Sequence, residues 1–418
     1  VARKCQVSCF VNHSPSLHNF IIIAYRTSRF VHLLGCSSPN LPLPLPRPQP
    51  PVRFRQFADM CWDTHAGTSE SPRAVQVVRN DILKLGLIAD IQYADCEDGT
   101  DYDKVEERHF RNALVIAKQA VVSWNEERVE AVIQLGDIID GRNFQAGESE
   151  KAMAAVLSVL DECKAPKRYD LIGNHEMYNV KRKDLAASGL RCLGESGKTY
   201  YSASLTDKWE AVFLDSYEWA LIGMDSSEEG YQKAVELMKV KNPAVIDPTN
   251  KDWFAGLSPE MHRYVPYNGG MSPEQVSWLE ATLKQVAADN RKALVFSHVP
   301  LYEGATKPKT MVWNLEDVMG VLHQYKDCVA GVFAGHDHNG GYSVDAAGLH
   351  HITMNSPMTA PVGSDCWATL ECAPDGTACF KSFGRACVES KTSGRGRVHE
   401  QIFLAPGAEN KPKEGTQL

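Results

Sequence analysis

Five short stretches of this chain end on side chains that can bind a metal ion. Each is an apolar, strand-like run whose last residue carries a carboxylate, an amide or an imidazole. These residues are Asp90, Asp137, Asn174, His298 and His336. Oxygen and imidazole ligands without thiolate are typical of manganese, magnesium or iron sites rather than of structural zinc sites. The pattern therefore predicts one metal centre built by several distant segments.

Each motif alone also has a structural interpretation. An Asp that follows a strand often caps the next helix, and Asp137 and Asp140 in "GDIID" could bind the amides of a tight turn. The stretch "GNHE" at 173–176 could be a capping loop, and a single histidine such as His298 is often a hydrogen-bonded core residue. "GHDH" at 335–338 is harder to explain this way, because it places two imidazoles two residues apart. The five motifs in this order favour the metal site.

The segments around these motifs alternate between strands and helices. From about residue 80, three strand-like runs are separated by helical patterns at 104–124 and 148–163. A later helix is expected after Ser272, a good N-cap, with Gln275 completing a capping box. This order predicts an α/β fold with a largely parallel sheet. The carboxyl ends of parallel strands converge on one crevice, which would bring the five motifs together.

Composition limits the class of protein. The net charge of −8 and a pI near 6.0 argue against a protein that binds nucleic acid through a basic face. No apolar stretch approaches the roughly 20 residues that span a bilayer, so we expect no membrane segment. The twelve cysteines include no CxxC pair, and we expect mostly buried, reduced thiols.

Three regions are expected along the chain. Residues 1–79 are set apart because the first 58 contain no acidic residue, seven Arg or Lys and a proline-rich run. They would be a disordered extension resembling an organelle transit peptide, or untranslated upstream sequence. We expect a catalytic domain at 80–385 and a flexible tail at 386–418. The expected location is the cytoplasm, or an organelle if the extension is a true transit peptide.

The motif series resembles the calcineurin-like metallophosphoesterase superfamily. That pattern is D-x-H, G-D-x-x-D, G-N-H-[DE], H and G-H-x-H, and this chain has "DIQ", "GDIID", "GNHE", "SH" and "GHDH". The departure is Gln92, which stands where the superfamily normally has histidine. With "IADIQYAD", "NGGMSPEQVSWLE" and "FAGHDHNGGYS", this glutamine is similar to the manganese-dependent ADP-ribose/CDP-alcohol diphosphatase family. The likeness spans about residues 83–384.

The resemblance implies a sandwich of two mixed β-sheets flanked by helices, with two divalent cations at the strand ends. Manganese would be preferred, with magnesium, iron or zinc as alternatives. The implied ligands are Asp90, Gln92 and His338 for one cation, Asn174, His298 and His336 for the other, and Asp137 as a bridge. Gln92 has two interpretations: a weak oxygen ligand that favours manganese over zinc, or a residue that leaves a coordination position open. Asp140 would orient a histidine.

The implied reaction is hydrolysis of a diphosphate bond by water that the cations activate. ADP-ribose would give AMP and ribose 5-phosphate, and CDP-choline would give CMP and phosphocholine. His175 would stabilise or protonate the leaving oxygen, or else orient Asp140 or a metal ligand. The alternatives are a phosphomonoesterase, a cyclic-nucleotide phosphodiesterase, a non-catalytic scaffold or a nucleotide sensor. We expect a monomer whose partner is a small-molecule nucleoside diphosphate.

The residues that contact the substrate are less clear from the sequence. Half-buried aromatic residues more often pack in the core than stack on a base. The candidates are Arg142 and Asn143 for a second phosphate, and Tyr93, Tyr102, Trp313 and Tyr342 for a nucleobase.

Overall fold

Two six-stranded sheets form the centre of the protein. The computed structural model describes residues 82–101, 104–250, 252–387 and 399–404. The first sheet has the order β14 (Gln401–Leu404), β13 (Ala378–Gly384), β12 (Cys366–Cys372), β1 (Leu83–Ile88), β4 (Ala131–Gln134) and β5 (Lys167–Asp170). The second has the order β10 (Gly341–Val344), β11 (His350–Thr353), β9 (Val329–Ala334), β8 (Lys292–Phe296), β7 (Trp209–Phe213) and β6 (Tyr201–Ser204). A separate ribbon pairs β2 (Gly99–Thr100) with β3 (Glu107–Arg108).

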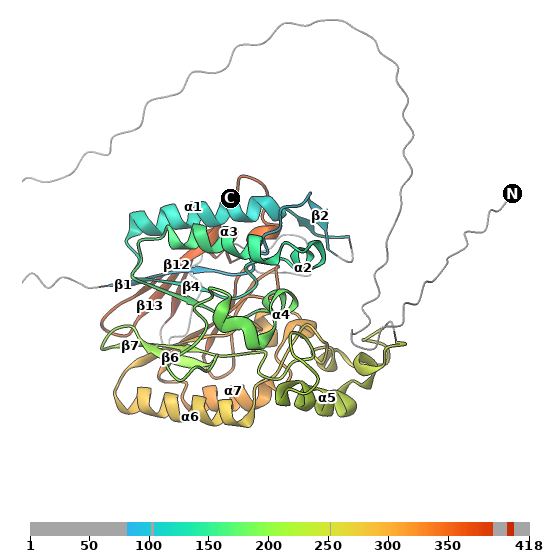
Figure 1. The fold of residues 1–418 in the computed structure, drawn as a ribbon. Coiled ribbons are helices and arrows are strands. Elements are labelled where there is room, and N and C mark those ends of the chain that lie inside the picture. Colours follow the sequence, from blue (N-terminus) through green and yellow to red (C-terminus); the bar gives the residue numbers. More distant parts are fainter. Residues whose placement is uncertain (1–81, 102–103, 251, 388–398, 405–418) are drawn as a thin grey trace, which may run out of the picture. The chain divides into compact units, whose positions relative to one another are not determined.

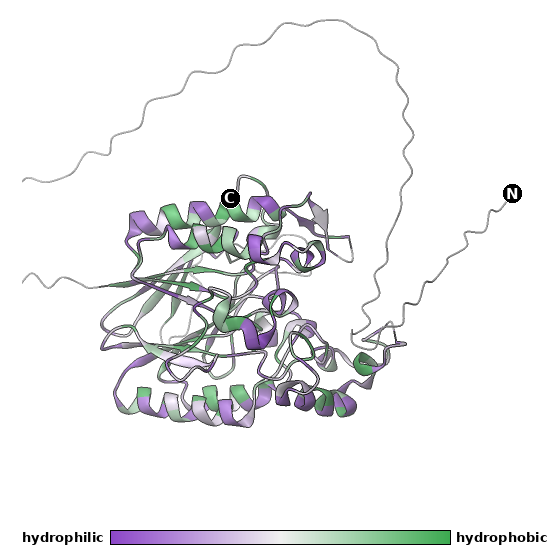
Figure 2. Ribbon diagram, in the orientation of Figure 1, coloured by the Kyte–Doolittle hydropathy of each residue, from purple (hydrophilic) through white to green (hydrophobic). Residues whose placement is uncertain are grey.

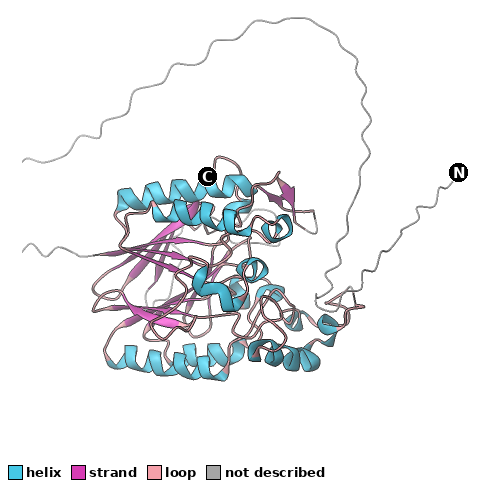
Figure 3. Cartoon of the chain, viewed as in Figure 1, coloured by secondary structure: helices cyan, strands magenta, loops and turns pink. Residues whose placement is uncertain are grey.

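Helices cover the outer face of each sheet, which gives four layers (Figures 1 and 3). The first sheet is covered by α1 (Phe110–Glu127) and α3 (Ser149–Asp161), and the second by α6 (Pro273–Ala288) and α7 (Leu315–Gln324). The shorter helices are α2 (Arg142–Ala146), α4 (Asn174–Asn179) and α5 (Glu229–Lys241). Short 3-10 turns lie at η1 (Arg182–Ala187), η2 (Pro243–Ile246), η3 (Pro259–Met261), η4 (Glu303–Ala305), η5 (Pro308–Thr310) and η6 (Pro357–Thr359).

The helices are amphipathic, as a layer between a sheet and solvent requires. Along α1 the buried residues recur every three or four positions, from Phe110 to Trp124. Trp124 packs against Gly86 of β1, where any Cβ would collide with the indole ring. Figure 2 shows both hydrophobic and hydrophilic residues along these outer helices.

Strand direction explains why distant motifs meet. In the first sheet β1, β4 and β5 are parallel, and in the second β7, β8, β9 and β11 are parallel, while the remaining pairs are antiparallel. The prediction of two mixed sheets flanked by helices is therefore confirmed. The segments that follow β1, β4, β5, β8 and β9 carry the five motifs.

Two local predictions are wrong. The helical pattern at 104–124 begins only at Phe110, because residues 107–108 pair with residues 99–100 in the β2–β3 ribbon. Ser272 caps α6 by accepting the Gln275 N–H, but the Gln275 side chain binds Asp215 and Glu218 instead of returning to the cap. The Glu218 carboxylate accepts the Ser272 N–H in its place, at 3.0 Å.

The ordered chain also extends further than expected. Strand β14 lies within the segment that we expected to be a flexible tail, and it pairs with β13 through Ala378↔Leu404 and Lys381↔Gln401. The expected extension at 1–79 lies outside the described residues. The eight described cysteines are free thiols, five of them buried, which agrees with the prediction of reduced thiols. None of the described helices has the length and apolar composition needed to cross a bilayer.

Candidate metal centre

The five motifs meet where the carboxyl ends of the two sheets face each other. Asp90, Asp137 and Asn174 come from the first sheet, and His298 and His336 from the second. All five are buried. The ligand atoms of Asp137, His298 and His336 lie within 4.8 Å of one another, and so do those of Asp90, Asp137 and His338. Asp137 is common to both groups, which is the position that a bridging carboxylate requires.

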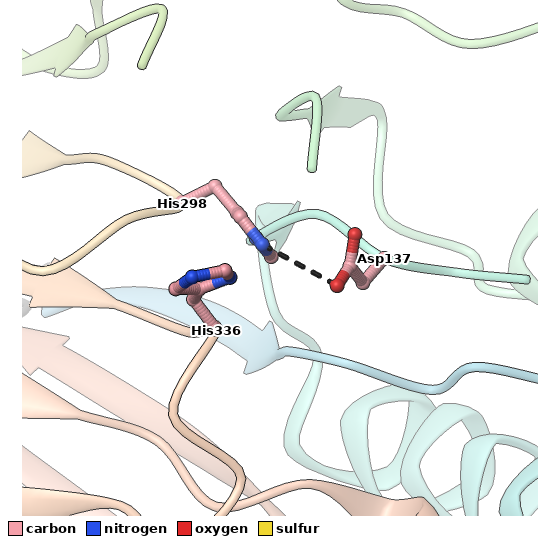
Figure 4. Close-up of side chains that lie close together, drawn as sticks. All are labelled: Asp137, His298 and His336. Atoms are coloured by element: carbon pink, nitrogen blue, oxygen red, sulfur yellow. Dashed lines mark ion pairs between the residues drawn. The ribbon is translucent and has the colours of Figure 1, made fainter. Parts of the chain in front are cut away.

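Figure 4 shows Asp137, His298 and His336 projecting from three separate loops into one space. The Nε2 atom of His298 lies 3.4 Å from Asp137 Oδ2. Asp90 is held from the other sheet, because both of its carboxylate oxygens accept the backbone N–H of His336, at 2.9 and 3.0 Å.

The backbone at this centre adopts an unusual conformation. Asp90, Gln92, Asp137 and His336 all have positive φ, between 44° and 70°, a region that non-glycine residues seldom occupy. Such strain typically persists at functional sites, where surrounding contacts maintain it. The glycine that precedes Asn174 has a different role: a Cβ at Gly173 would overlap the carboxylate of Asp137.

Hydrogen bonds determine which nitrogen of two histidines faces the centre. His298 Nδ1 lies 2.7 Å from the carbonyl oxygen of Leu135, so Nδ1 carries the proton and donates it. In the neutral ring Nε2 then has the free lone pair, and it is buried without a hydrogen-bond partner. Orienting a ligand histidine through its other nitrogen is the usual arrangement in metal sites.

Asn268 fixes the ring of His336 in the same way. The Asn268 Nδ2 donates to two carbonyl oxygens, of Arg263 and Lys309, so its Oδ1 is the acceptor that faces His336 Nε2 at 2.7 Å. His336 Nδ1 is then the nitrogen left to bind a metal. The sequence interpretation gave Asn268 no role, although it begins the "NGG" stretch noted in the resemblance.

Gln92 lies inside the centre. Its Nε2 is 3.1 Å from Asp137 Oδ2 and 2.7 Å from His338 Nε2, and its Oε1 is buried without a hydrogen-bond partner. The amide thus contacts two implied ligands through its nitrogen, while its oxygen, the atom that could bind a cation, is left without a partner.

We expect Gln92→His to change metal preference more than stability. Imidazole binds zinc better than an amide oxygen does, so the affinity for zinc relative to manganese should rise by about 10-fold, while the free energy of unfolding should change by less than about 1 kcal/mol. Competition titrations of the two metals and urea denaturation would measure these effects. The control is Gln285→His, at an exposed position of α6. An unchanged affinity ratio would leave Gln92 without a role in metal choice.

Asn174 and His175 begin helix α4, directly after Gly173. The Asn174 Oδ1 accepts a hydrogen bond from the buried hydroxyl of Tyr217, at 3.3 Å. The His175 N–H donates to Asp137 Oδ1 at 2.7 Å, which ties α4 to the Asp137 carboxylate. His175 Nδ1 accepts the backbone N–H of Gly141 at 2.8 Å, so in the neutral ring Nε2 carries the proton. Asp140 Oδ2 lies 3.5 Å from the same Nδ1.

Glu176 is a structural residue that the sequence interpretation missed. Its fully buried carboxylate accepts the backbone N–H groups of Asp137, Ile138 and Gly173, each at 2.7 Å. Burial, followed by the nearby Asp137 charge, raises the pKa of Glu176 to about 7. The sequence could have pointed to Glu176, because it is the last residue of "GNHE", where the superfamily pattern has an acidic residue.

Glu176→Ala is expected to lower the free energy of unfolding by about 3 kcal/mol. Each buried N–H group left without an acceptor costs about 1–3 kcal/mol, and three would lose theirs. Urea denaturation of metal-free protein would measure the loss. The exposed Glu195→Ala variant should stay within about 0.5 kcal/mol of the parent, and a loss that small at Glu176 would contradict its proposed clamping role.

The buried acidic and imidazole side chains of the centre have shifted pKa values. Burial raises the pKa of Asp90. For Asp137, burial is outweighed by His298, His175 and His336, which hold its pKa below the usual range. Burial lowers the pKa of His336, and burial with Arg108 lowers that of His338 to about 3. Burial opposes the charge of His298, but the neighbouring Asp137 outweighs it and raises the pKa of His298 to about 9. Gln92 Oε1 and His298 Nε2 are buried without a hydrogen-bond partner, and this set of oxygen and imidazole donors fits divalent cations.

Most of the suggested substrate residues have structural roles. Trp313 is fully buried and donates its indole N–H to the Val265 carbonyl. The Asn143 amide donates to the carbonyls of Tyr93 and Asp140. The guanidinium of Arg142 lies 4.2 Å from the centre of the Phe110 ring.

Of the three remaining aromatic candidates, Tyr93 is half-buried and packs against the hydrophobic core. The Tyr342 hydroxyl lies 3.0 Å from His350 Nδ1, at the sheet edge that β10 forms. Tyr102 lies outside the described residues.

Comparison with known proteins agrees with this geometry. Residues 83–340 match the calcineurin-like phosphoesterase family. Relatives named manganese-dependent ADP-ribose/CDP-alcohol diphosphatase include one from Arabidopsis thaliana, 34% identical over 68% of this chain and 89% of its own length. The human relative of that name is 30% identical over 80% of this chain and 96% of its own. The crystal structure of a dimetal phosphatase from Danio rerio has a TM-score of 0.68 and 31% identity, covering 78% of this chain and 99% of that one. The chain belongs to the calcineurin-like phosphoesterase family.

Proposed function

We propose that this chain is a manganese-dependent hydrolase that cleaves the diphosphate bond of ADP-ribose and of CDP-alcohols such as CDP-choline. The observation that carries the proposal is the position of Asp137, whose carboxylate belongs to both groups of ligand atoms. The relatives that bear this enzyme name cover most of the described chain, which supports the substrate class. The products would be AMP and ribose 5-phosphate, or CMP and phosphocholine.

The proposed metal ligands are the seven residues implied by the motif series: Asp90, Gln92, Asp137, Asn174, His298, His336 and His338. When bound, two divalent cations supply Lewis acidity and a water of lowered pKa, and they neutralise charge on the attacked phosphate. The protein holds the ligand atoms in place before any cation binds. Asn268 and the Leu135 carbonyl orient two of the imidazoles, and Glu176 fixes the loop that carries Asp137.

His175 is the proposed proton donor to the leaving oxygen. The ring would donate as the imidazolium and be left as the neutral imidazole, and Nε2 is the nitrogen that can reach the leaving oxygen because Nδ1 faces the Gly141 N–H. The side chain is 15% exposed, whereas that of Asp137 is 1% exposed, so a substrate can reach the imidazole more easily. Asp140, beside Nδ1, would stabilise the ring when it carries a positive charge.

A product assay tests the function. The wild-type chain should release AMP from ADP-ribose and CMP from CDP-choline, faster with manganese than with magnesium. Turnover of cyclic AMP or p-nitrophenyl phosphate above that of the diphosphates would instead indicate a phosphodiesterase or a monoesterase. No manganese-stimulated hydrolysis of any of the four would indicate a scaffold or a nucleotide sensor.

We further propose that the catalytic domain, predicted at 80–385, also includes β14, and that the protein works as a monomer in the cytoplasm. The pairing of β14 with β13 supports the longer domain. Eight free thiols among the described residues suit a reducing compartment. Analytical ultracentrifugation and imaging of the tagged full chain would test the last two proposals.

A further inference from the structure

The segment that follows β7 supplies none of the seven proposed metal ligands, yet Tyr217 in this segment reaches the centre. The side chain of Tyr217 is fully buried. Its hydroxyl oxygen lies 3.3 Å from Asn174 Oδ1 and 3.0 Å from the backbone carbonyl oxygen of Tyr267. A phenol has one proton to donate, and both of these oxygens are acceptors. The hydroxyl therefore ties Asn174 Oδ1 and the Tyr267 carbonyl to a single point.

Both tied groups belong to one side of the proposed centre. We call its cation the second cation, the one assigned to Asn174, His298 and His336. Tyr267 directly precedes Asn268, whose Oδ1 lies 2.7 Å from His336 Nε2 and orients that ring. The hydroxyl of Tyr217 thus joins one ligand of the second cation to the segment that orients another.

The same segment also contacts the loop of the third ligand, His298. The hydroxyl of Ser216 lies 2.8 Å from that of Ser297 and accepts the backbone N–H of Val299 at 3.3 Å. Ser297 and Val299 are the two neighbours of His298 in the chain. The ring centre of Tyr217 is 6.0 Å from that of His298. Ser216 and Tyr217 together therefore reach the surroundings of all three ligands.

The backbone of Tyr217 is fixed on both sides, which gives its hydroxyl a defined position. Its N–H donates to Asp215 Oδ1 at 2.9 Å, and its carbonyl accepts from Arg182 Nη1 at 3.1 Å. The buried carboxylate of Asp215 also accepts hydrogen bonds from Arg182 and Thr199. Removing the hydroxyl alone should leave the ring where it is, so Tyr217→Phe isolates the contribution of that one oxygen.

We propose that Tyr217 is a positioning residue for the second cation, and that it acts by holding Asn174 Oδ1 in place. This inference rests on the two-cation centre proposed above. The terminal torsion of an asparagine has a broad range, so a neighbour must hold the amide if its oxygen is to stay in position for a metal. Partners that orient metal ligands typically change metal affinity by about 10- to 100-fold when they are removed. Loss of the hydroxyl should therefore weaken the second cation and spare the first.

Calorimetric titration of the metal-free protein with manganese tests this assignment without any substrate. The parent should bind two ions. In Tyr217→Phe the dissociation constant of one ion should stay unchanged, and that of the other should rise by about 10- to 100-fold. The control is Tyr200→Phe, which removes the hydroxyl of another buried tyrosine, one that accepts a hydrogen bond from Lys198. This control should bind both ions like the parent, and thermal denaturation would check that each variant is folded.

A double variant shows whether the effect passes through Asn174. Asn174→Ala removes the proposed ligand itself, so adding Tyr217→Phe should weaken manganese binding no further. Activity gives a third measurement: saturating manganese should restore the kcat of Tyr217→Phe on ADP-ribose, because metal occupancy is lost and the chemical groups are kept.

Unchanged binding of both ions by Tyr217→Phe would overturn the assignment. Equal weakening of both ions, additive losses in the double variant, or a parent that binds fewer than two ions would overturn it as well. A parent that binds two ions but hydrolyses no diphosphate would refute the proposed function, and the titration would still decide the role of Tyr217.

Discussion

Replacing Asp137 by asparagine is expected to lower kcat/KM for ADP-ribose by about 10³-fold or more while the protein stays folded. A bridging carboxylate reduces the repulsion between two cations, and its neutral amide analogue cannot. Stabilisation by bound metals is worth several kcal/mol, and each 1.4 kcal/mol is a factor of ten in rate. Asparagine is chosen because residue 137 has a φ of 61°, a conformation that asparagine tolerates and alanine does not. Its Oδ1 can still accept the His175 N–H.

Metal titration separates this effect from unfolding. Calorimetry should show that Asp137→Asn binds manganese more weakly, or binds one ion where the parent binds two. The control is Asp345→Asn, which removes another buried carboxylate, one that accepts hydrogen bonds from His323 and His351. Asp345→Asn should keep the activity. Near-normal turnover by Asp137→Asn would show that this residue does not bridge two metals.

The order of strands and helices was enough to predict a largely parallel sheet and the meeting of the five motifs, whereas the sandwich of two sheets was implied by the family resemblance. The reason is that alternating strands and helices force a parallel arrangement, and parallel strands place their carboxyl ends at one edge. Asp90 and His336 are 246 positions apart, yet their segments meet through the hydrogen bond between the His336 N–H and the Asp90 carboxylate. The order of strands and helices in the sequence thus indicates where in the fold the site lies.

What sequence could not supply is the set of residues that hold the ligands in place. Glu176 and Asn268 act through backbone groups of other segments, and such contacts depend on loop conformation rather than on any residue pattern. The β2–β3 ribbon was also missed, because two-residue strands have no periodicity to detect.

Substrate residues were the weakest sequence prediction. Trp313 and Asn143 have a buried ring and a buried amide that already bind backbone carbonyls, so neither can contact a ligand without breaking its own hydrogen bonds. An aromatic or polar residue near a motif is therefore a poor indicator of contact with substrate.

His175→Ala is expected to lower kcat for ADP-ribose by about 10²-fold, at the lower end of what a general acid contributes. The leaving group of a diphosphate is itself a phosphate, whose second pKa is ~6, so it needs only partial help from a proton donor. An ester with an alkoxide leaving group, such as cyclic AMP if it is cleaved at all, should lose more. Manganese affinity should stay within about threefold, because the His175 side chain is not a proposed ligand. The measurement is a rate profile across leaving groups beside a manganese titration, with half-exposed His323→Ala as the control. An equal loss for every leaving group, accompanied by weaker manganese binding, would mean that His175 positions Asp137 and Asp140 instead of donating a proton.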